Sequence, residues 1–243
     1  MTPRLLVVQH EDTCPPGLLG AWLAEADVAL EVVRAHRGDP LPESLGQQDG
    51  LVVLGGEMGA LDDDVAPWLP RVRRLVASTV EAGRPFLGVC LGHQLAAAGL
   101  GGTVTRNPAG HSQGVTPFRH TGQGADDPLL SSVAPDSPVV QWNNDIVVDL
   151  PPGAESLATS PDGSVQAARF GPLAWGVQCH PEATPAIFRG WTVEKPSAAR
   201  LAEVGIDIHA AARVVAERAR EMEAAWAPFG HRFAAVVREH AHS

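Results

Sequence analysis

Positive charge is scarce in this chain of 243 residues. Lysine occurs once, at Lys195, and Lys and Arg together number 18 against 28 Asp and Glu, so the formal net charge is −10. No Lys/Arg cluster interrupts this acidic balance, which argues against a nucleic-acid-binding surface. The preference for arginine over lysine accompanies abundant Ala, Gly and Pro; it is typical of a coding bias and carries no functional information.

Cysteines and long apolar runs are also few. The three cysteines, Cys14, Cys90 and Cys179, cannot all pair, and none shows metal-site spacing. We therefore expect no metal and no cofactor. The chain enters an apolar strand directly, without an apolar leader segment, and no apolar run approaches the length of a membrane span. These absences predict a cytoplasmic protein without membrane contact.

Apolar runs of strand length alternate with helical patterns in the N-terminal part of the chain. This alternation predicts βαβ units with right-handed crossovers, and hence an α/β fold with an open, mixed, mainly parallel sheet flanked by helices. The expected strands are 4–9, 30–34, 51–54 and 86–89, and the expected helices are 17–26, 66–82 and 91–99. From Thr103 to Cys179, short strands and Gly/Pro/Asp turns predict an antiparallel extension of the sheet that carries the loops closing a pocket.

The last part of the chain has helical patterning. Asp207 fits a helix N-cap. Pro228 is expected to end the helix that starts there, and a second helix then finishes the chain. We see no internal repeat or linker, and expect one domain over residues 1–243, with a catalytic core at about 4–190 and a helical extension at about 197–241. An apolar stripe at helical spacing predicts core or interface packing for Ile208, Ala212, Val215, Ala219, Met222 and Trp226.

The most informative stretch is Leu87-Gly88-Val89-Cys90-Leu91-Gly92-His93-Gln94. An apolar strand runs into a Gly-x-Cys-x-Gly turn and an Ala/Leu-rich helix follows at once, which is typical of a nucleophile elbow with sulfur in place of oxygen. Gly88 and Gly92 lie where a Cβ would clash, and Cys90 lies at a helix N-terminus that favours thiolate. A buried cysteine is more often a small hydrophobe, but the two glycines favour a nucleophile. Such a free thiol suits a reducing cytoplasm.

A second apolar strand ends in His180-Pro181-Glu182. Proline stops the strand at the residue that would act as base, and Glu182 can turn back to accept the imidazole N–H and fix its tautomer. Nucleophile, base and orienting carboxylate are thus expected at strand ends, where an open α/β sheet has its ligand crevice. Cys179 should face the opposite side of its strand, in the core. His93 is expected to face solvent or cap a helix, and Cys14 to be incidental.

Through these two motifs the chain resembles the class I (triad-type) glutamine amidotransferases from Arg4 to about Phe233. Its nearest likeness is to the free-standing GMP synthase-like branch, in which the glutaminase domain is the whole protein. Further segments carry the resemblance: Gly50-Leu51-Val52-Val53-Leu54-Gly55-Gly56-Glu57-Met58-Gly59, Asn107-Pro108-Ala109-Gly110-His111-Ser112-Gln113-Gly114, Gln141-Trp142-Asn143-Asn144-Asp145 and Val165-Gln166-Ala167-Ala168-Arg169-Phe170-Gly171.

The resemblance implies a flavodoxin-like fold and a Cys-His-Glu triad that hydrolyses the glutamine side-chain amide through a γ-glutamyl thioester. It implies that the backbone N–H groups of Gly56 and Leu91 form the oxyanion hole. Glutamine would be held by Gly55, by Gln94 on the elbow helix, and by the segment Asn144-Asp145. For the Asp145 carboxylate, a role at the α-ammonium and a role as a turn residue stay equally open. Gln166 is expected to support the catalytic strand.

Three departures from the family pattern fall on segments expected to rim the glutamine pocket. Asn143-Asn144 replaces His-Gly, Ser112-Gln113-Gly114-Val115 replaces Glu-Ile/Val-Gly-Trp, and Glu57 stands where the loop usually has Pro. The triad is unchanged. We interpret this as retained chemistry with an altered substrate or partner surface, and weakened glutamine binding is the alternative.

Several functions fit these motifs. The leading one is a glutaminase that passes ammonia to a separate synthase subunit, because the chain carries no synthase domain. The second is a stand-alone hydrolase of γ-glutamyl peptides or amides. A non-catalytic regulatory subunit on the same fold conflicts with the intact Cys90, His180 and Glu182. Another cysteine-elbow family, the DJ-1/PfpI-like proteins, fits the His-Pro-Glu placement poorly.

Overall fold

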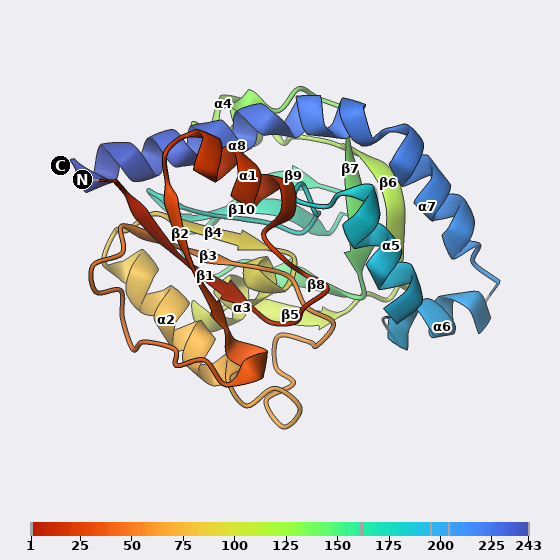
Figure 1. Ribbon diagram of the computed structural model, residues 1–243, viewed down its shortest axis with the longest axis horizontal. Helices are drawn as coiled ribbons and strands as arrows, with labels where there is room; N and C mark the ends of the chain where they lie inside the picture. Colours follow the sequence, from red (N-terminus) through yellow and green to blue (C-terminus); the bar gives the residue numbers. More distant parts are fainter. Residues whose placement is uncertain (1, 161–162, 195, 204, 243) are drawn as a thin grey trace.

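The computed structural model describes residues 2–160, 163–194, 196–203 and 205–242, and a seven-stranded sheet forms its centre (Figure 1). The strand β10 is antiparallel to both of its neighbours, whereas the other neighbouring strands pair in parallel. The predicted mixed, mainly parallel sheet flanked by helices is therefore confirmed. From edge to edge the order is β2 (Ala29–Arg34), β1 (Arg4–Gln9), β3 (Gly50–Val53), β4 (Phe86–Val89), β11 (Ala174–Val177), β10 (Val165–Gly171) and β9 (Glu155–Thr159).

The middle of the sheet is covered on both faces. Every residue of β3, β4 and β11 is buried, which explains why these strands are continuous apolar runs rather than alternating ones. In β1 the side chains divide between the two faces: Leu5 and Val7 belong to one core cluster, and Leu6 and Val8 to the other. The four N-terminal strands lie within one residue of their predicted bounds.

Helices form a layer on each face of the sheet (Figure 1). On one face α1 (Gly17–Glu25) packs beside the long α8 (Ala219–Ala241), and on the other α2 (Leu69–Glu81) packs beside α3 (Leu91–Gly99). The helix α2 begins three residues later than predicted. Pro67 disfavours helical backbone at the residue before it, whereas Pro70, in the first turn of α2, is compatible with a helix start.

Two short antiparallel ribbons lie outside the main sheet. One pairs β5 (Thr103–Arg106) with β8 (Asp145–Asp149), and the other pairs β6 (Ser112–Phe118) with β7 (Ser137–Asn143). The predicted antiparallel extension is thus partly wrong, because of the strands between Thr103 and Cys179 only β9, β10 and β11 join the sheet, and β11 is parallel to β4. Val104 and Val147 of the first ribbon pack into the α2–α3 core instead. The remaining short elements are α4 (Gly122–Asp126) and the 3₁₀ turns Ala35–Arg37 and Leu130–Ser132.

The C-terminal part contains α5 (Pro185–Glu194), α6 (Pro196–Glu203) and α7 (Ile208–Glu217) before α8. Asp207 caps α7, as predicted, by accepting the N–H of Ala210 at 2.8 Å. The expected apolar stripe packs inward, with Ile208, Val215, Met222 and Trp226 buried. These helices extend the molecule beyond one end of the β6–β7 ribbon (Figure 1).

The prediction that Pro228 ends a helix is wrong. The break comes at Arg218, and α8 continues through Pro228 to Ala241. Tertiary packing holds the chain helical on both sides of the proline: the Trp226 indole donates to the carbonyl of Pro138 at 3.1 Å, and Phe229 is fully buried. Pro228 itself is exposed, so its ring displaces no core side chain.

The arrangement of the strands brings several chain segments to one edge of the sheet. Because β1, β3, β4 and β11 are neighbouring parallel strands, their carboxyl ends meet there. The residues that follow these ends include His10, the pair Gly55-Gly56, Cys90 and His180. A ligand crevice is expected at this edge of an open α/β sheet.

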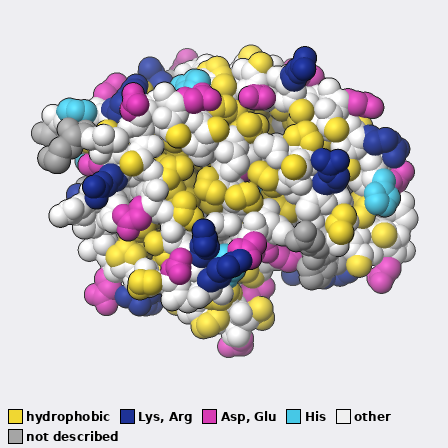
Figure 2. Space-filling model, viewed as in Figure 1, with side chains coloured by type: hydrophobic (Ala, Val, Ile, Leu, Met, Phe, Trp, Pro, Cys, Tyr) yellow, Lys and Arg dark blue, Asp and Glu magenta, His cyan; other side chains and the backbone are white. Residues whose placement is uncertain are grey.

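No helix among residues 2–160, 163–194, 196–203 and 205–242 combines the length and apolarity needed to cross a membrane. On the face drawn in Figure 2, Lys and Arg side chains are scattered between Asp and Glu side chains rather than gathered in one area. That face therefore presents charges of both signs.

Replacing Pro228 by Ala should stabilise the protein, because the new N–H can donate to the carbonyl of Ala224 inside α8. We expect the free energy of unfolding in urea to rise by about 1–3 kcal/mol. Glu223→Ala, an exposed change on the same helix, serves as the control and should shift it by less than about 0.5 kcal/mol. A loss of stability in Pro228→Ala would show instead that the proline bend is needed for packing.

Candidate active site

Cys90 occupies a strained turn between β4 and α3. Its φ is +50° and its ψ is −104°, a conformation that non-glycine residues rarely adopt. The turn is possible because the backbone packs closely around it: a Cβ on Gly92 would collide with the carbonyl of Val53, and one on Gly88 would lie 2.6 Å from the Gly92 carbonyl carbon. Strain of this kind is typical of functional sites, where it aims one side chain.

His180 and Glu182 lie beyond the end of β11. The backbone N–H of His180 donates to Val140 of β7 at 2.8 Å, which ties the segment to the outer ribbon. The imidazole Nδ1 and Glu182 Oε1 are 2.7 Å apart, and both side chains are almost completely buried. With Nδ1–H donating to the carboxylate, Nε2 is the ring nitrogen available to exchange a proton with a partner.

The electrostatics of this pair favour imidazolium. Burial alone would lower the pKa of His180, but the charges of Glu182 and Cys90, with hydrogen bonds to both side chains, outweigh it and raise the pKa to about 10. The ring also packs against Trp191 of α5, with 4.5 Å between the ring centroids. His180 can thus hold a proton taken from Cys90, and is then a cation between the Glu182 carboxylate and an apolar wall.

One backbone carbonyl lies beside both predicted catalytic residues. The oxygen of Trp142, in β7, is 3.9 Å from Cys90 Sγ and 3.4 Å from His180 Nε2, and can accept a hydrogen from either. The Trp142 ring in turn packs edge-on against Phe188 of α5. The outer ribbon and α5 therefore shape the space around the sulfur and the imidazole.

Gly55 and Gly56 follow β3 and lie directly beside this centre. A Cβ on Gly55 would be 3.1 Å from His180 Cε1 and 3.6 Å from Cys90 Cβ, so the main chain passes where a side chain would crowd both residues. Within the described part of the chain, neither Gly56 nor Leu91 donates its N–H to a backbone acceptor. Both N–H groups thus remain for another partner.

A cavity of about 670 Å³ opens at the sulfur. Two ion pairs, Arg106–Asp145 and Arg200–Glu57, form part of its wall. Its lining consists of Gly56, Glu57, Met58, Gly59, Asp62, Val65, Cys90, Gln94, Arg106, His111, Trp142, Asn143, Asn144, Asp145 and Arg200. Of the residues predicted to bind substrate, Gln94, Asn144 and Asp145 therefore line the cavity, and Gly55 does not.

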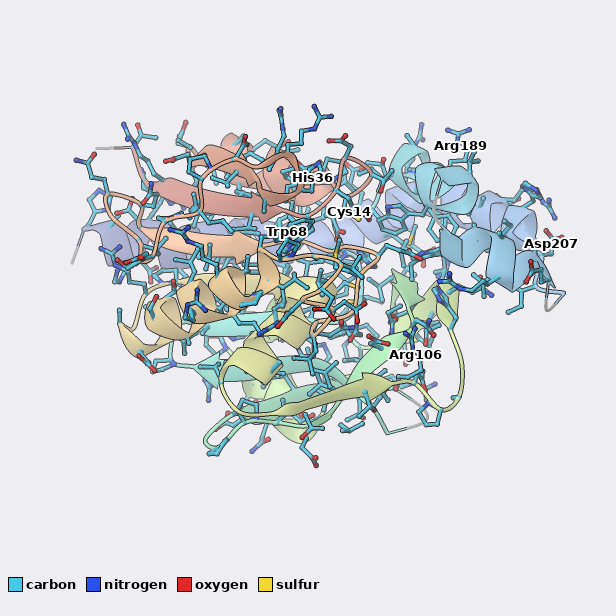
Figure 3. All side chains as sticks on the ribbon, turned by 90° about the horizontal axis from the view of Figure 1, so that it is seen from below. Cys14, His36, Trp68, Arg106, Arg189 and Asp207 are labelled. Atoms are coloured by element: carbon cyan, nitrogen blue, oxygen red, sulfur yellow. The ribbon has the colours of Figure 1, made fainter. Side chains whose placement is uncertain are left out.

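Asp145 stands at the start of β8, with its carboxylate largely buried at the cavity wall. Burial raises its pKa, the Arg106 guanidinium 3.3 Å away lowers it, and Asp62 raises it. Arg106 comes from the end of β5 and is labelled in Figure 3. A buried carboxylate with one exposed cationic neighbour is suited to a second cation from a ligand.

Gln94 and Gln178 connect Asp145 to the sulfur. Gln94 Nε2 donates to the Asp145 backbone carbonyl at 2.8 Å and to Gln178 Oε1 at 3.1 Å. Gln178 Nε2 in turn donates to Cys90 Sγ at 3.5 Å. Gln178 was not predicted as a site residue, although it lies two positions before His180 in the segment that follows β11, and alternate residues of an extended chain face the same side.

A family model described as "Glutamine amidotransferase class-I" matches residues 19–192, which include all three predicted triad residues. The chain belongs to the class I glutamine amidotransferase family. Cys90, His180, Glu182 and every residue that lines the cavity except Arg200 therefore lie within the matched class I glutamine amidotransferase segment.

Proteins that are similar to this chain in sequence bear names of the same kind. The glutamine amidotransferase-like protein YfeJ of Salmonella typhimurium is 29% identical over 184 residues, which cover 74% of this chain and 76% of that protein. A glutamine-hydrolysing GMP synthase subunit of Haloarcula marismortui is 41% identical over 157 residues, 64% of this chain and 75% of that protein. The GMP synthase of Aeropyrum pernix is 33% identical over 165 residues, 68% of this chain, but the match spans only 30% of that protein.

Solved structures of other proteins have the same fold as this chain. A glutamine amidotransferase from Thermotoga maritima superposes with a TM-score of 0.84 at 24% identity, covering 96% of this chain and 99% of that one. A glutamine amidotransferase from Methylobacillus flagellatus gives 0.80 at 26% identity, covering 99% and 95%.

The three departures from the family pattern lie in different places. Glu57 lines the cavity, and its Oε1 accepts from Arg200 of α6 at 3.3 Å. Asn143 and Asn144 also line it, at the turn between β7 and β8. The expectation that Ser112–Val115 form a rim loop is wrong, because this segment is part of β6 and pairs with β7; His111, just before it, reaches the cavity instead.

Of the two residues given lesser roles, His93 differs from expectation, whereas the incidental role of Cys14 stays a prediction. His93 is fully buried rather than solvent-facing; it lies against Phe170, and burial lowers its pKa to about 3. Cys14 is buried, with its sulfur 3.0 Å from Glu11 Oε1 and 3.8 Å from the point where a Gly55 Cβ would be. It lies near the centre of the molecule (Figure 3), close to the triad rather than away from it.

Changing Glu182 to Gln should alter how stability depends on pH. The pKa of His180 is raised from 6.5 to about 10, so its charged form adds stability that is complete below pH 6.5 and is lost as the pH rises towards about 10. Without the carboxylate charge this loss should shrink by more than about 1 kcal/mol. Urea unfolding across this pH range measures it.

The matched control is Glu25→Gln, which removes the exposed partner of His231. Exposed pairs contribute little, so the pH profile should keep the wild-type shape. If Glu182→Gln loses as much stability as the wild type across the same range, the buried ion pair is not its source.

Proposed function

We propose that this protein hydrolyses the side-chain amide of glutamine to glutamate and ammonia, using Cys90 as nucleophile, His180 as acid and base, and Glu182 as the orienting carboxylate. The observation that carries the proposal is the meeting of a strained cysteine elbow with a buried His–Glu pair at a cavity beside a glycine loop. Each of these features has a role in acyl transfer to sulfur.

The chemistry requires two acyl transfers. The Cys90 thiol gives its proton to His180, the sulfur attacks the glutamine Cδ, and the C–N bond breaks as His180 protonates the departing ammonia. A γ-glutamyl thioester remains on Cys90. Water, losing a proton to His180, then attacks the thioester carbonyl; the C–S bond breaks and glutamate leaves.

Negative charge develops on the carbonyl oxygen in both steps. The N–H groups of Leu91 and Gly56 are the proposed donors to it: Leu91 follows Cys90 in the chain, Gly56 lines the same cavity as Cys90, and neither N–H has a backbone acceptor in the described residues. Removing one such donor typically reduces the rate about 10²–10³-fold. The N-terminus of α3 adds its partial positive charge at the same place.

The amino-acid end of glutamine is proposed to lie between Gln94 and Asp145. Both amide hydrogens of Gln94 are already donated within the protein, so Gln94 can only accept from the substrate, through Oε1. The Asp145 carboxylate matches the α-ammonium, which would add a buried cationic partner. Asn144 and Gly55 offer backbone groups beside it.

The destination of the ammonia is proposed from the names of relatives. The relative from Haloarcula marismortui bears the name of a GMP synthase subunit, and the match spans less than a third of the GMP synthase of Aeropyrum pernix. We propose that a separate synthase subunit receives the ammonia, since this relative is named as one subunit of a glutamine-hydrolysing synthase.

One observation favours a second candidate, a hydrolase of γ-glutamyl peptides or amides. The cavity of about 670 Å³ is of the size that holds ligands well beyond an amino acid. Glu57 and Arg200 at its wall are a charged pair that could adjust to a larger leaving group. The catalytic steps would be the same, with an amine leaving in place of ammonia.

Release of ammonia and glutamate by the purified protein tests the proposal. Glutamine and a panel of γ-glutamyl peptides are compared, and Cys90→Ala is expected to remove all turnover because no other thiol occupies the elbow. Cys179→Ala is the matched control: it also removes a buried thiol, but that side chain faces the core, so activity should stay within about twofold of the wild type.

The substrate panel separates the two candidates. Turnover of glutamine identifies a glutaminase, and turnover of peptides alone identifies the γ-glutamyl hydrolase. Hydrolysis that persists in Cys90→Ala would overturn both, since both require the sulfur.

A further inference from the structure

Gln178 is fully buried and contacts the sulfur of Cys90 through its side-chain amide. It follows β11 directly, two residues before His180, and its Nε2 lies 3.5 Å from Sγ. The backbone N–H of Gln178 donates to Gln166 of β10 at 2.8 Å, which holds the segment in place. The contact joins the nucleophile to a residue with no ionisable group.

The direction of this amide is determined by a chain of hydrogen bonds that starts at a backbone carbonyl. The Asp145 carbonyl can only accept, so the Gln94 amide must present its NH₂ group to it. The same NH₂ group donates to Gln178, which must therefore present Oε1 to Gln94. Its own NH₂ group is left facing Cys90 Sγ.

We propose that Gln178 is a further catalytic residue, whose amide N–H stabilises the Cys90 thiolate before attack and again when the thioester breaks. This inference rests on the proposed function, since it takes Cys90 as the nucleophile. When the thiol proton moves to His180 Nε2, negative charge appears on Sγ, and a neutral donor that already faces the sulfur becomes a charge-assisted one. No proton is transferred to or from the amide.

The chain of hydrogen bonds also connects the sulfur to the proposed substrate-binding wall. Its first member is the backbone of Asp145, whose side chain lines the cavity. A shift of this backbone would change the direction of the Gln94 amide and, through it, that of Gln178. The thiolate is thereby coupled to the position of the β7–β8 turn, where the sequence departs from the family pattern.

A second buried amide pair provides the comparison. Gln141 Nε2 donates to Gln166 Oε1 at 2.8 Å, on strands next to the site, and neither residue lines the cavity. Gln178→Met and Gln166→Met each remove one acceptor from such a pair and replace a glutamine with a side chain of similar length. Only Gln178→Met also removes a hydrogen-bond donor to the Cys90 sulfur.

The test is the rate at which iodoacetamide alkylates Cys90 at neutral pH without substrate, followed by peptide mass spectrometry. The loss of thiolate ultraviolet absorbance on alkylation is measured alongside it. We expect Gln178→Met to react about tenfold more slowly than the wild type, since a hydrogen bond to a charged group is lost. Gln166→Met should react within about twofold of the wild type.

Gln178→Leu repeats the measurement if the Met variant does not fold, as judged by its urea transition. The proposal is overturned if the folded Gln178 variants alkylate at the wild-type rate, or if Gln166→Met slows the reaction equally. Because alkylation needs no turnover, this readout is separate from the proposed function: a protein without glutaminase activity could still show the Gln178 effect.

Discussion

The close approach of α3 to β3 and β4 at the Cys90 turn is the constraint on which the rest of the site depends. Gly92 passes the carbonyl of Val53 at a distance that leaves no room for a Cβ, and this lets the chain leave β4 and enter α3 without a connecting loop. Cys90 is forced to a positive φ as a consequence. Its sulfur is thereby held beside the ends of β3 and β11, where the glycine loop and His180 lie.

The charges at the site are kept in place by burial. Glu182 and His180 lie almost entirely out of water, so their mutual attraction is little screened. The neutral groups around the sulfur, namely the Trp142 carbonyl, the Gln178 amide and the helix N-terminus, have fixed directions before any substrate arrives. Such preorganised dipoles do not need to reorient when charge develops during a reaction. The rigidity of the site thus follows from the packing of β4, β7 and β11 around it.

Much of the fold could be predicted from the sequence because its signals are local. The four N-terminal strands and the Cys90 turn are encoded by apolar runs and by two glycines, although β2, at the edge of the sheet, is mostly not buried, and Asp207 marks the start of α7. Pro228 shows the limit: its local preference opposes a helix, but distant contacts of Trp226 with Pro138 outweigh that preference. The separation of the β5–β8 and β6–β7 ribbons from the main sheet likewise depends on packing, of the first against α3 and of the second against α7 and α8.

In the candidate site, the sequence motifs predicted the residues that belong to them and missed the others. The cysteine elbow and the His-Pro-Glu motif predicted that Cys90, His180 and Glu182 act together, and the fold brings these three residues close to one another. Gln178 was missed because its role depends on a glutamine 84 residues away in sequence, and Arg200 because α6 carries no motif. Contacts of this kind arise from tertiary structure, and a single sequence holds no sign of them.

A covalent γ-glutamyl group on Cys90 is the central claim that can be tested most directly. The protein is mixed with glutamine, quenched in acid within the turnover time and digested, and the peptide that contains Cys90 is examined by mass spectrometry. The account predicts an added γ-glutamyl group on Cys90 that disappears after treatment with hydroxylamine. Glutamate formation without any adduct on Cys90, or with the adduct on Cys14 or Cys179 instead, would contradict it.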